Sequence, residues 1–244
     1  MVLVVVIPLW VLEFRGGGAK MSGDFAVSPG EVLDIIIGGE GETDNLTTAA
    51  GGGGTGVVKG GSLLIIAGGG AGAEVVHPNY AGKHASITED GFDGSTGSGF
   101  MPPGQGGTGG TDGEDYTFIP NGNIARGGRG FNSGAMGTYG QDAFINSGEG
   151  TSGSWGLGGG GGSVGNGACN CSGGGGYSGG GAPDVNGSGG GGSFNIGSNP
   201  DDMTMANDGD GFLTITYCLI LDTDGDGIPD EEDNCPTVAN EGIL

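Results

Sequence analysis

Long runs of glycine constrain this chain more than any other feature of its sequence. The runs occupy residues 158–162, 173–176, 179–181 and 189–192, and glycine accounts for 66 of the 244 residues. Glycine loses the most backbone entropy on folding and has no side chain to bury. An ordinary enzyme domain built around one large apolar core is therefore not expected. Collagen is excluded as well, because glycine does not recur at every third position.

The net charge excludes a second class of protein. The chain has 29 acidic residues and 6 lysines and arginines, which gives a formal net charge of −23. Six cations cannot neutralise many phosphates, so a nucleic-acid-binding protein is not expected.

The longest apolar run, residues 1–12, is shorter than the roughly 18–20 residues that a membrane-spanning helix needs. It has no basic residue before it and no small-residue cleavage site after it, unlike a typical signal peptide. We interpret it as one or two buried β-strands that end at the glycines after residue 15.

Short apolar segments alternate with glycine-rich turns in the first third of the chain, which predicts a mainly β fold. Residues 32–37 and 63–66 are apolar on both faces, as strands in the core of a β-sandwich are. Residues 57–70 as a whole are predicted to be one strand that runs into glycines, and Ser28-Pro29-Gly30-Glu31 is a predicted turn. Further strands are expected at 116–119 and 212–221, within and after an otherwise loop-like stretch, and no segment has a helical period.

The glycine-rich stretch 146–211 allows two interpretations. It is a flexible linker unless backbone hydrogen bonds hold it. Alternatively, several glycine segments pack side by side as polyproline-II-like helices, because no Cβ keeps their backbones apart. Large side chains interrupt the runs at Trp155, Leu157, Tyr177 and Phe194, and the strand at 212–221 could close a sheet that begins at the amino-terminus. Both observations favour order.

Residues 28–41, 62–73, 169–182 and 189–217 resemble the glycine-rich domain of the anaplastic lymphoma kinase and leukocyte tyrosine kinase receptors, which also occurs in secreted bacterial proteins. The resemblance covers roughly residues 1–217 and is one of pattern and composition. It implies a β-sandwich-like frame with glycine-rich loops packed as polyglycine-II helices. The receptor members of that family bind cytokine ligands, whereas this chain shows no kinase sequence.

The sharpest motif is DTDGDGIPDEED, residues 222–233. Its first three aspartates occupy alternate positions, a glycine comes next, and the remaining acids follow that glycine. This is the spacing of a twelve-residue Ca²⁺ loop with ligands at positions 1, 3, 5, 7, 9 and 12. Position 12 is an aspartate rather than the glutamate of an EF-hand, and no flanking helices are predicted. The predicted metal ligands are Asp222, Asp224, Asp226, the backbone carbonyl of Ile228, Asp230 and Asp233.

Together with Asn234-Cys235-Pro236, residues 222–240 resemble one thrombospondin type 3 repeat. The resemblance implies Ca²⁺ as the bound cofactor, and in that family repeats share ions and link cysteines to neighbouring repeats. We therefore divide the chain into a glycine-rich β domain, residues 1–217, and an irregular calcium-binding tail, residues 218–244. Because the chain starts in a strand and ends in a repeat, we expect it to be a fragment of a larger secreted protein.

Four cysteines fit an oxidising, extracellular setting. We favour a disulfide between Cys218 and Cys235, which would tether the last strand to the calcium loop. Cys169 and Cys171 are too close to bond each other without strain, so they pair with another chain or stay reduced. His77 and His84 have no neighbouring catalytic partners in the sequence, and Asn207-Asp-Gly-Asp-Gly211 is predicted to be a turn before the last strand.

These features predict an extracellular calcium-binding structural or adhesion module, secreted or at the cell surface. The alternative is a ligand-binding ectodomain in which the calcium repeat is a stalk. Calcium is the expected partner, with another protein or a cell-surface component as a second. A co-purifying protein partner would favour the ectodomain, whereas self-association or surface anchoring would favour the structural module. No enzyme is expected, because the sequence shows neither a nucleophile–base pair nor paired carboxylates outside the calcium loop.

Overall fold

The computed structural model describes residues 2–4, 16–41, 50–73, 82–95, 102–118, 123–133, 157, 159, 171–184, 187–217 and 221–239. Within them the chain is mainly β, and the only helical element is the 3₁₀ turn η2 (Phe131–Ser133). All strand pairings in this part of the chain are antiparallel. The predictions for residues 5–12, His77, Trp155, Cys169 and Cys218 fall outside the described residues.

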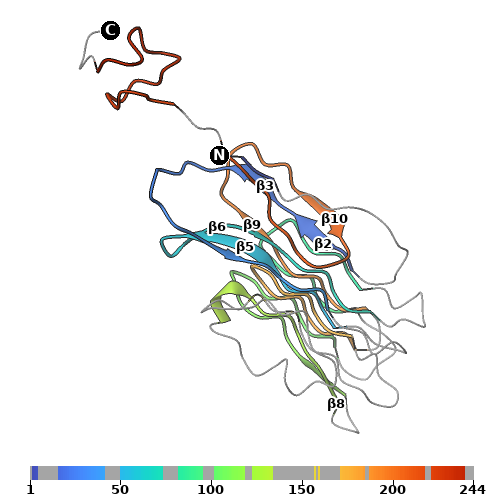
Figure 1. Cartoon of the computed structure of the whole chain (residues 1–244). Helices are drawn as coiled ribbons and strands as arrows, with labels where there is room; N and C mark the ends of the chain where they lie inside the picture. The colour runs from blue at the N-terminus through green and yellow to red at the C-terminus, as the bar shows by residue number, and fades with distance from the viewer. Residues whose placement is uncertain are drawn as a thin grey trace.

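A four-stranded sheet lies at the centre of the fold (Figure 1). Its order is β4 (Leu33–Ile36), β5 (Thr55–Lys59), β6 (Ser62–Ala67), β9 (Phe194–Asn195). The stretch predicted as one strand over 57–70 is a hairpin instead, because Gly60 and Gly61 reverse the chain. Both glycines have positive φ, 54° and 82°, as a tight hairpin turn requires.

The predicted strands at 32–37 and 63–66 are confirmed as β4 and β6, but only β6 is buried as expected. Leu64, Ile65 and Ile66 are at most 7% exposed, whereas Val32 is 70% and Ile35 46% exposed. The reason is position: β4 is the last strand of its sheet, and β6 is flanked by β5 and β9. The expectation that residues 32–37 are buried on both faces is therefore wrong.

Three smaller sheets complete the described fold. They are β11 (Ile215–Thr216), β1 (Val2–Val4) and β3 (Ser22–Asp24) in that order, β10 (Met203–Asn207) with β2 (Gly18–Lys20), and β7 (Tyr116–Phe118) with β8 (Asn123–Ala125). The pairing of Val2 with Thr216 confirms that a late strand closes a sheet begun at the amino-terminus. That late strand, β11, is shorter than the strand predicted at 212–221. Strand β7 confirms the predicted strand that begins at residue 116.

Apolar clusters cover both faces of the central sheet. On one face Val57 and Ile65, which are cross-strand partners, pack with Met21 and Phe25. On the other, Ile66 packs with residues that include Ile36 and Leu157. Figure 1 shows β2, β3 and β10 on one side of the central sheet and glycine-rich segments on the other.

The described parts of the glycine-rich stretch are held by backbone hydrogen bonds to distant segments. The amide of Gly69 donates to Gly175 O at 2.7 Å, the amide of Gly191 donates to Gly69 O at 3.0 Å, and the amide of Gly128 donates to Gly180 O at 2.8 Å. Residues 171–176 and 187–193 are buried. Of the two interpretations of 146–211, this favours order over a flexible linker for the residues described.

Candidate metal centre

Residues 221–239 consist of turns and bends, drawn in red in Figure 1. The amide of Asp230 donates to Leu221 O at 2.7 Å and so brings the ninth residue of the predicted loop next to the residue that precedes the loop. The amide of Asp233 donates to Pro229 O at 2.9 Å, which turns the chain once more over the last residues of the loop. Each of these described hydrogen bonds joins residues of the same segment.

Two glycines shape the loop around the first aspartate. Gly225 and Gly227 have φ values of 76° and 91°, a left-handed conformation that side-chain-bearing residues rarely adopt. Their amides both donate to the carboxylate of Asp222, at 2.8 Å and 3.0 Å. The glycine at loop position 6 therefore has the conformational role that the motif predicted.

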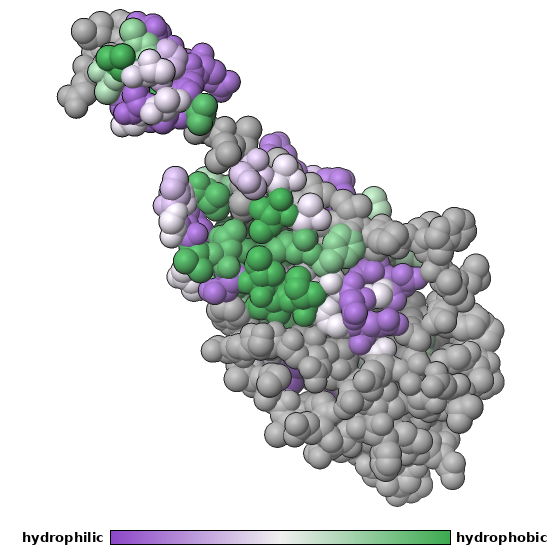
Figure 2. Space-filling model, viewed as in Figure 1, coloured by the Kyte–Doolittle hydropathy of each residue, from purple (hydrophilic) through white to green (hydrophobic). Residues whose placement is uncertain are grey.

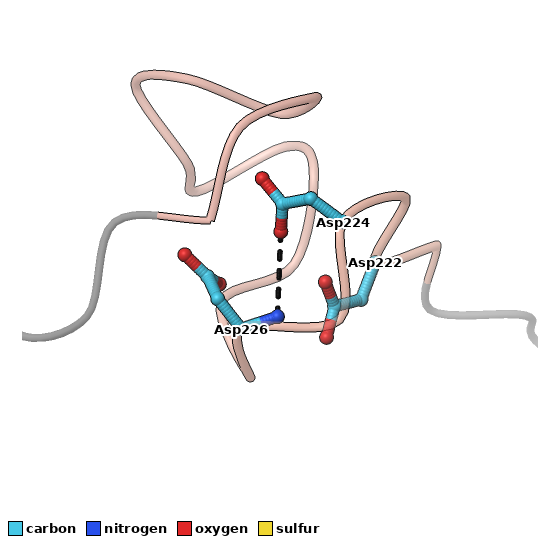
Figure 3. A group of neighbouring side chains, drawn as sticks. All are labelled: Asp222, Asp224 and Asp226. Atoms are coloured by element: carbon cyan, nitrogen blue, oxygen red, sulfur yellow. Dashed lines mark hydrogen bonds between the residues drawn. The ribbon is translucent and has the colours of Figure 1, made fainter.

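The structure brings three of the predicted ligands together. Asp222, Asp224 and Asp226 each offer a carboxylate oxygen, and these oxygens lie within 4.8 Å of one another. Figure 3 shows the three side chains on the loop, with the amide of Asp226 donating to Asp224. All three residues are half-buried. Three carboxylates this close repel one another unless a cation lies between them.

The other predicted ligands have different surroundings. The amide of Ile228 donates to Asp226 Oδ1 at 2.9 Å. Both carboxylate oxygens of Asp230 accept hydrogen bonds from Thr223. Asp233 Oδ1 accepts a hydrogen bond from the amide of Cys235 at 2.8 Å. Asp230 and Asp233 are outside the group of three clustered carboxylates.

Two carboxylate oxygens in this segment are buried without a hydrogen-bond donor. They are Asp224 Oδ2 and Asp233 Oδ2. Burial raises the pKa of Asp224 above its usual value, and the nearby charges of Asp226, Asp233 and Asp222 add to the increase. A buried carboxylate oxygen without a partner is unfavourable, and a bound cation would satisfy it. Hard oxygen donors of this kind suit Ca²⁺. The donor set therefore fits the ion that the motif implies.

The predicted disulfide between Cys218 and Cys235 is wrong, because Cys235 is a free, exposed thiol. Cys235 is held within its own turn, where its amide donates to Asp233 and its carbonyl accepts from Val238. Cys171 is disulfide-bonded, so the alternative that it stays reduced is also wrong. The other half of that disulfide lies outside the described residues.

Two other residues that the sequence singled out, His84 and Asn207, make hydrogen bonds that hold the backbone in place. His84 Nδ1 accepts a 2.8 Å hydrogen bond from the amide of Gly17, and burial lowers the pKa of His84. The side chain of Asn207 bonds to Gly209 and Asp210, which confirms the predicted turn. Thr223 was missed by sequence reasoning, although a hydroxyl residue seven positions before an aspartate in a closed loop was a usable signal.

Comparison with known proteins agrees with the geometry of this segment. Residues 217–242 match the family model of the thrombospondin type 3 repeat. A search of curated proteins found no match to the chain. Among the described residues, no helix has the length and apolar character needed to cross a membrane. The stretch 217–242 is thus one thrombospondin type 3 repeat, a type of repeat that binds Ca²⁺.

Proposed function

We propose that this chain is an extracellular calcium-binding structural or adhesion module. The observation that carries the proposal is the clustering of Asp222, Asp224 and Asp226 beside the buried, unpartnered oxygens of Asp224 and Asp233. Thrombospondin type 3 repeats are typically extracellular, which supports a secreted or cell-surface location. Seven acids between residues 222 and 233 leave this segment strongly negative until a cation binds.

The proposed ligands follow the spacing of the loop. Asp222, Asp224, Asp226 and Asp233 would supply carboxylate oxygens, and Ile228 would supply its backbone carbonyl. Asp230 occupies the ninth position, at which such loops often reach the ion through water. Bound calcium would supply the positive charge that these carboxylates lack, and so hold the loop in one conformation.

The glycine-rich part, residues 1–217, is proposed to be a rigid frame like the receptor domain that it resembles. Backbone hydrogen bonds between its glycine segments support packing of the polyglycine-II kind. A Cβ added to Gly179 would lie 1.9 Å from Gly128 O, so these backbones are closer than any side chain would allow. No catalytic role is proposed for this frame.

The second candidate function is a ligand-binding ectodomain with the calcium repeat as a stalk. The observation in its favour is the exposed apolar surface beside the edge strand β4, where Val32, Ile35 and Ile37 are 70%, 46% and 40% exposed. Figure 2 shows a hydrophobic area on the face viewed, over the strands of the central sheet. Such surfaces mark sites of protein–protein contact in other proteins. Capture of a defined protein partner that Ile35→Asp abolishes would favour this candidate.

Calorimetric titration of the full chain with Ca²⁺ tests the first proposal. Extracellular modules of this kind bind with a Kd of about 10⁻⁴ to 10⁻³ M. We expect a Kd in that range, weaker binding of Mg²⁺, and a large loss of affinity in Asp226→Ala. Asp208→Ala is the matched control, because it removes an exposed acid from a turn in the glycine-rich domain. Absence of any Ca²⁺-dependent heat at millimolar concentration would refute calcium binding by this chain.

A further inference from the structure

One residue of the calcium loop has both carboxylate oxygens engaged by a single neighbour. The amide of Thr223 donates to Asp230 Oδ1 at 2.7 Å, and the hydroxyl of Thr223 donates to Asp230 Oδ2 at 2.6 Å. The amide of Asp230 in turn donates to Leu221 O. Three hydrogen bonds therefore connect residue 230 to residues 221 and 223, across the mouth of the loop.

Asp224 and Asp233 are engaged differently. Each uses Oδ1 for one local backbone bond, from Asp226 and Cys235 respectively. Each keeps Oδ2 buried and without a donor. These two oxygens can coordinate a cation without breaking any described hydrogen bond. Both oxygens of Asp230 already accept a hydrogen bond from Thr223. Both oxygens of Asp222 are engaged in a similar way by loop amides, but Asp230, unlike Asp222, lies outside the group of clustered carboxylates.

We infer that Asp230 is a positioning residue that clasps Thr223 and closes the loop, and that Asp224 and Asp233 are the carboxylates that gain most from the ion. This inference rests on the proposed function, since it assigns roles within the same calcium loop. The clasp holds Asp230 against the start of the loop before calcium arrives, so less conformational entropy is lost on binding. Outer-shell hydrogen bonds at metal sites typically contribute ten- to a hundredfold in metal affinity, and we expect the clasp to contribute in this range.

The experiment separates ligands from positioning residues by counting water molecules on the ion. Tb³⁺ replaces Ca²⁺ in oxygen-rich sites, and its luminescence lifetime in H₂O and D₂O reports how many water molecules it coordinates. Four variants of the full chain are compared with the wild type: Asp230→Ala, Asp233→Ala, Thr223→Val and Thr223→Ser. Ca²⁺ affinity is measured for each by calorimetry.

Removal of a ligand lets an additional water molecule reach Tb³⁺, whereas removal of a positioning residue does not. We expect Asp233→Ala to add coordinated water, and Asp230→Ala and Thr223→Val to keep the wild-type water count. Both of these clasp variants should lose about ten- to a hundredfold in Ca²⁺ affinity. Thr223→Ser keeps the amide and the hydroxyl, so its affinity should be close to that of the wild type.

Additional coordinated water in Asp230→Ala would show that Asp230 is a ligand and would overturn the inference. Wild-type affinity in Thr223→Val would overturn it too, because the clasp would then contribute nothing. In either case the wild type still binds calcium and the proposed function stands. If the wild type binds neither Ca²⁺ nor Tb³⁺, the proposed function is wrong, and the roles inferred for Asp224 and Asp233 are wrong with it.

Discussion

The hydroxyl of Tyr116 donates a 2.7 Å hydrogen bond to Asp184 Oδ1 in the interior of the glycine-rich part of the chain. The two residues are 6% and 1% exposed, so the carboxylate of Asp184 is shielded from water. Tyr116 starts β7 and packs with Ala125 and Ala182. This bond therefore links β7, in the sheet that β7 forms with β8, to a glycine-rich segment that carries few side chains.

Tyr116→Phe should destabilise the fold by about 1–3 kcal/mol, because it leaves a buried carboxylate without this donor. The measurement is the free energy of unfolding in urea. Tyr217→Phe is the control, since Tyr217 is 66% exposed and its loss should change the free energy little. Equal stability of the Tyr116 variant and the wild type would show that water or another group satisfies Asp184.

The same hydrogen bond predicts a loss of stability in alkaline solution. Burial, and then the hydrogen bond and charge of Asp184, raise the pKa of Tyr116 from 10.0 to about 12. Between pH 10 and 12 the hydroxyl of Tyr116 therefore keeps its proton in the folded state and loses it in the unfolded state. The contribution of this hydroxyl to the free energy of unfolding is complete below pH 10 and disappears as pH rises towards 12. Urea unfolding across this range should show the decline in the wild type. In Tyr116→Phe the decline should be smaller.

Close contact between glycine backbones predicts that single methyl groups are damaging. Gly179→Ala would place a Cβ 1.9 Å from the carbonyl oxygen of Gly128, and backbone cannot move aside as a side chain can. We expect Gly179→Ala to lower the free energy of unfolding by about 3 kcal/mol or more, which is the upper end of the range for overpacked sites. Gly209→Ala is the matched control, because its nearest neighbour would be 3.9 Å away. Thermal unfolding of both variants measures the difference.

Sequence patterns predicted the strands that carry apolar side chains and the acidic loop, for physical reasons that are visible in particular residues. Ile65 and Ile66 lie in an apolar run bounded by glycines, and that pattern is enough to predict a buried strand. Asp222, Asp224 and Asp226 cluster because alternate positions of a tight loop face inward. In both cases the information lies within a few neighbouring residues.

The remaining features depend on distant partners, which one sequence does not reveal. Ile35 is exposed because β4 has no described strand on its outer side, and periodicity cannot tell an edge strand from a central one. Glycine segments such as 173–176 have no side-chain pattern from which pairing could be deduced. Their partners, such as Gly52 for the amide of Gly175, are selected by backbone hydrogen bonds.

His84 predicts a loss of stability in acid. Its Nδ1 accepts a hydrogen bond from the buried amide of Gly17, which requires the neutral imidazole, and burial lowers its pKa below 6.5. The contribution of the neutral His84 to the free energy of unfolding is therefore complete above about pH 6.5. It is lost as pH falls through the lowered pKa, because His84 takes up a proton at higher pH in the unfolded chain than in the folded one. Urea unfolding at pH 7.5 and pH 5 should give a larger difference for the wild type than for His84→Gln. Identical differences would contradict the prediction.

Removal of calcium should expose the repeat to proteolysis without affecting the β frame. Glu231 and Glu232 are exposed in the calcium-loop segment, so a glutamate-specific protease can report its opening. Calcium at about 100 times its Kd stabilises a single site by about 2.7 kcal/mol, which should slow cleavage through the open state roughly a hundredfold. Asp222→Ala removes a clustered carboxylate and should be cleaved equally fast with calcium and with chelator. Calcium-independent cleavage of the wild type would mean that the ion does not order this loop.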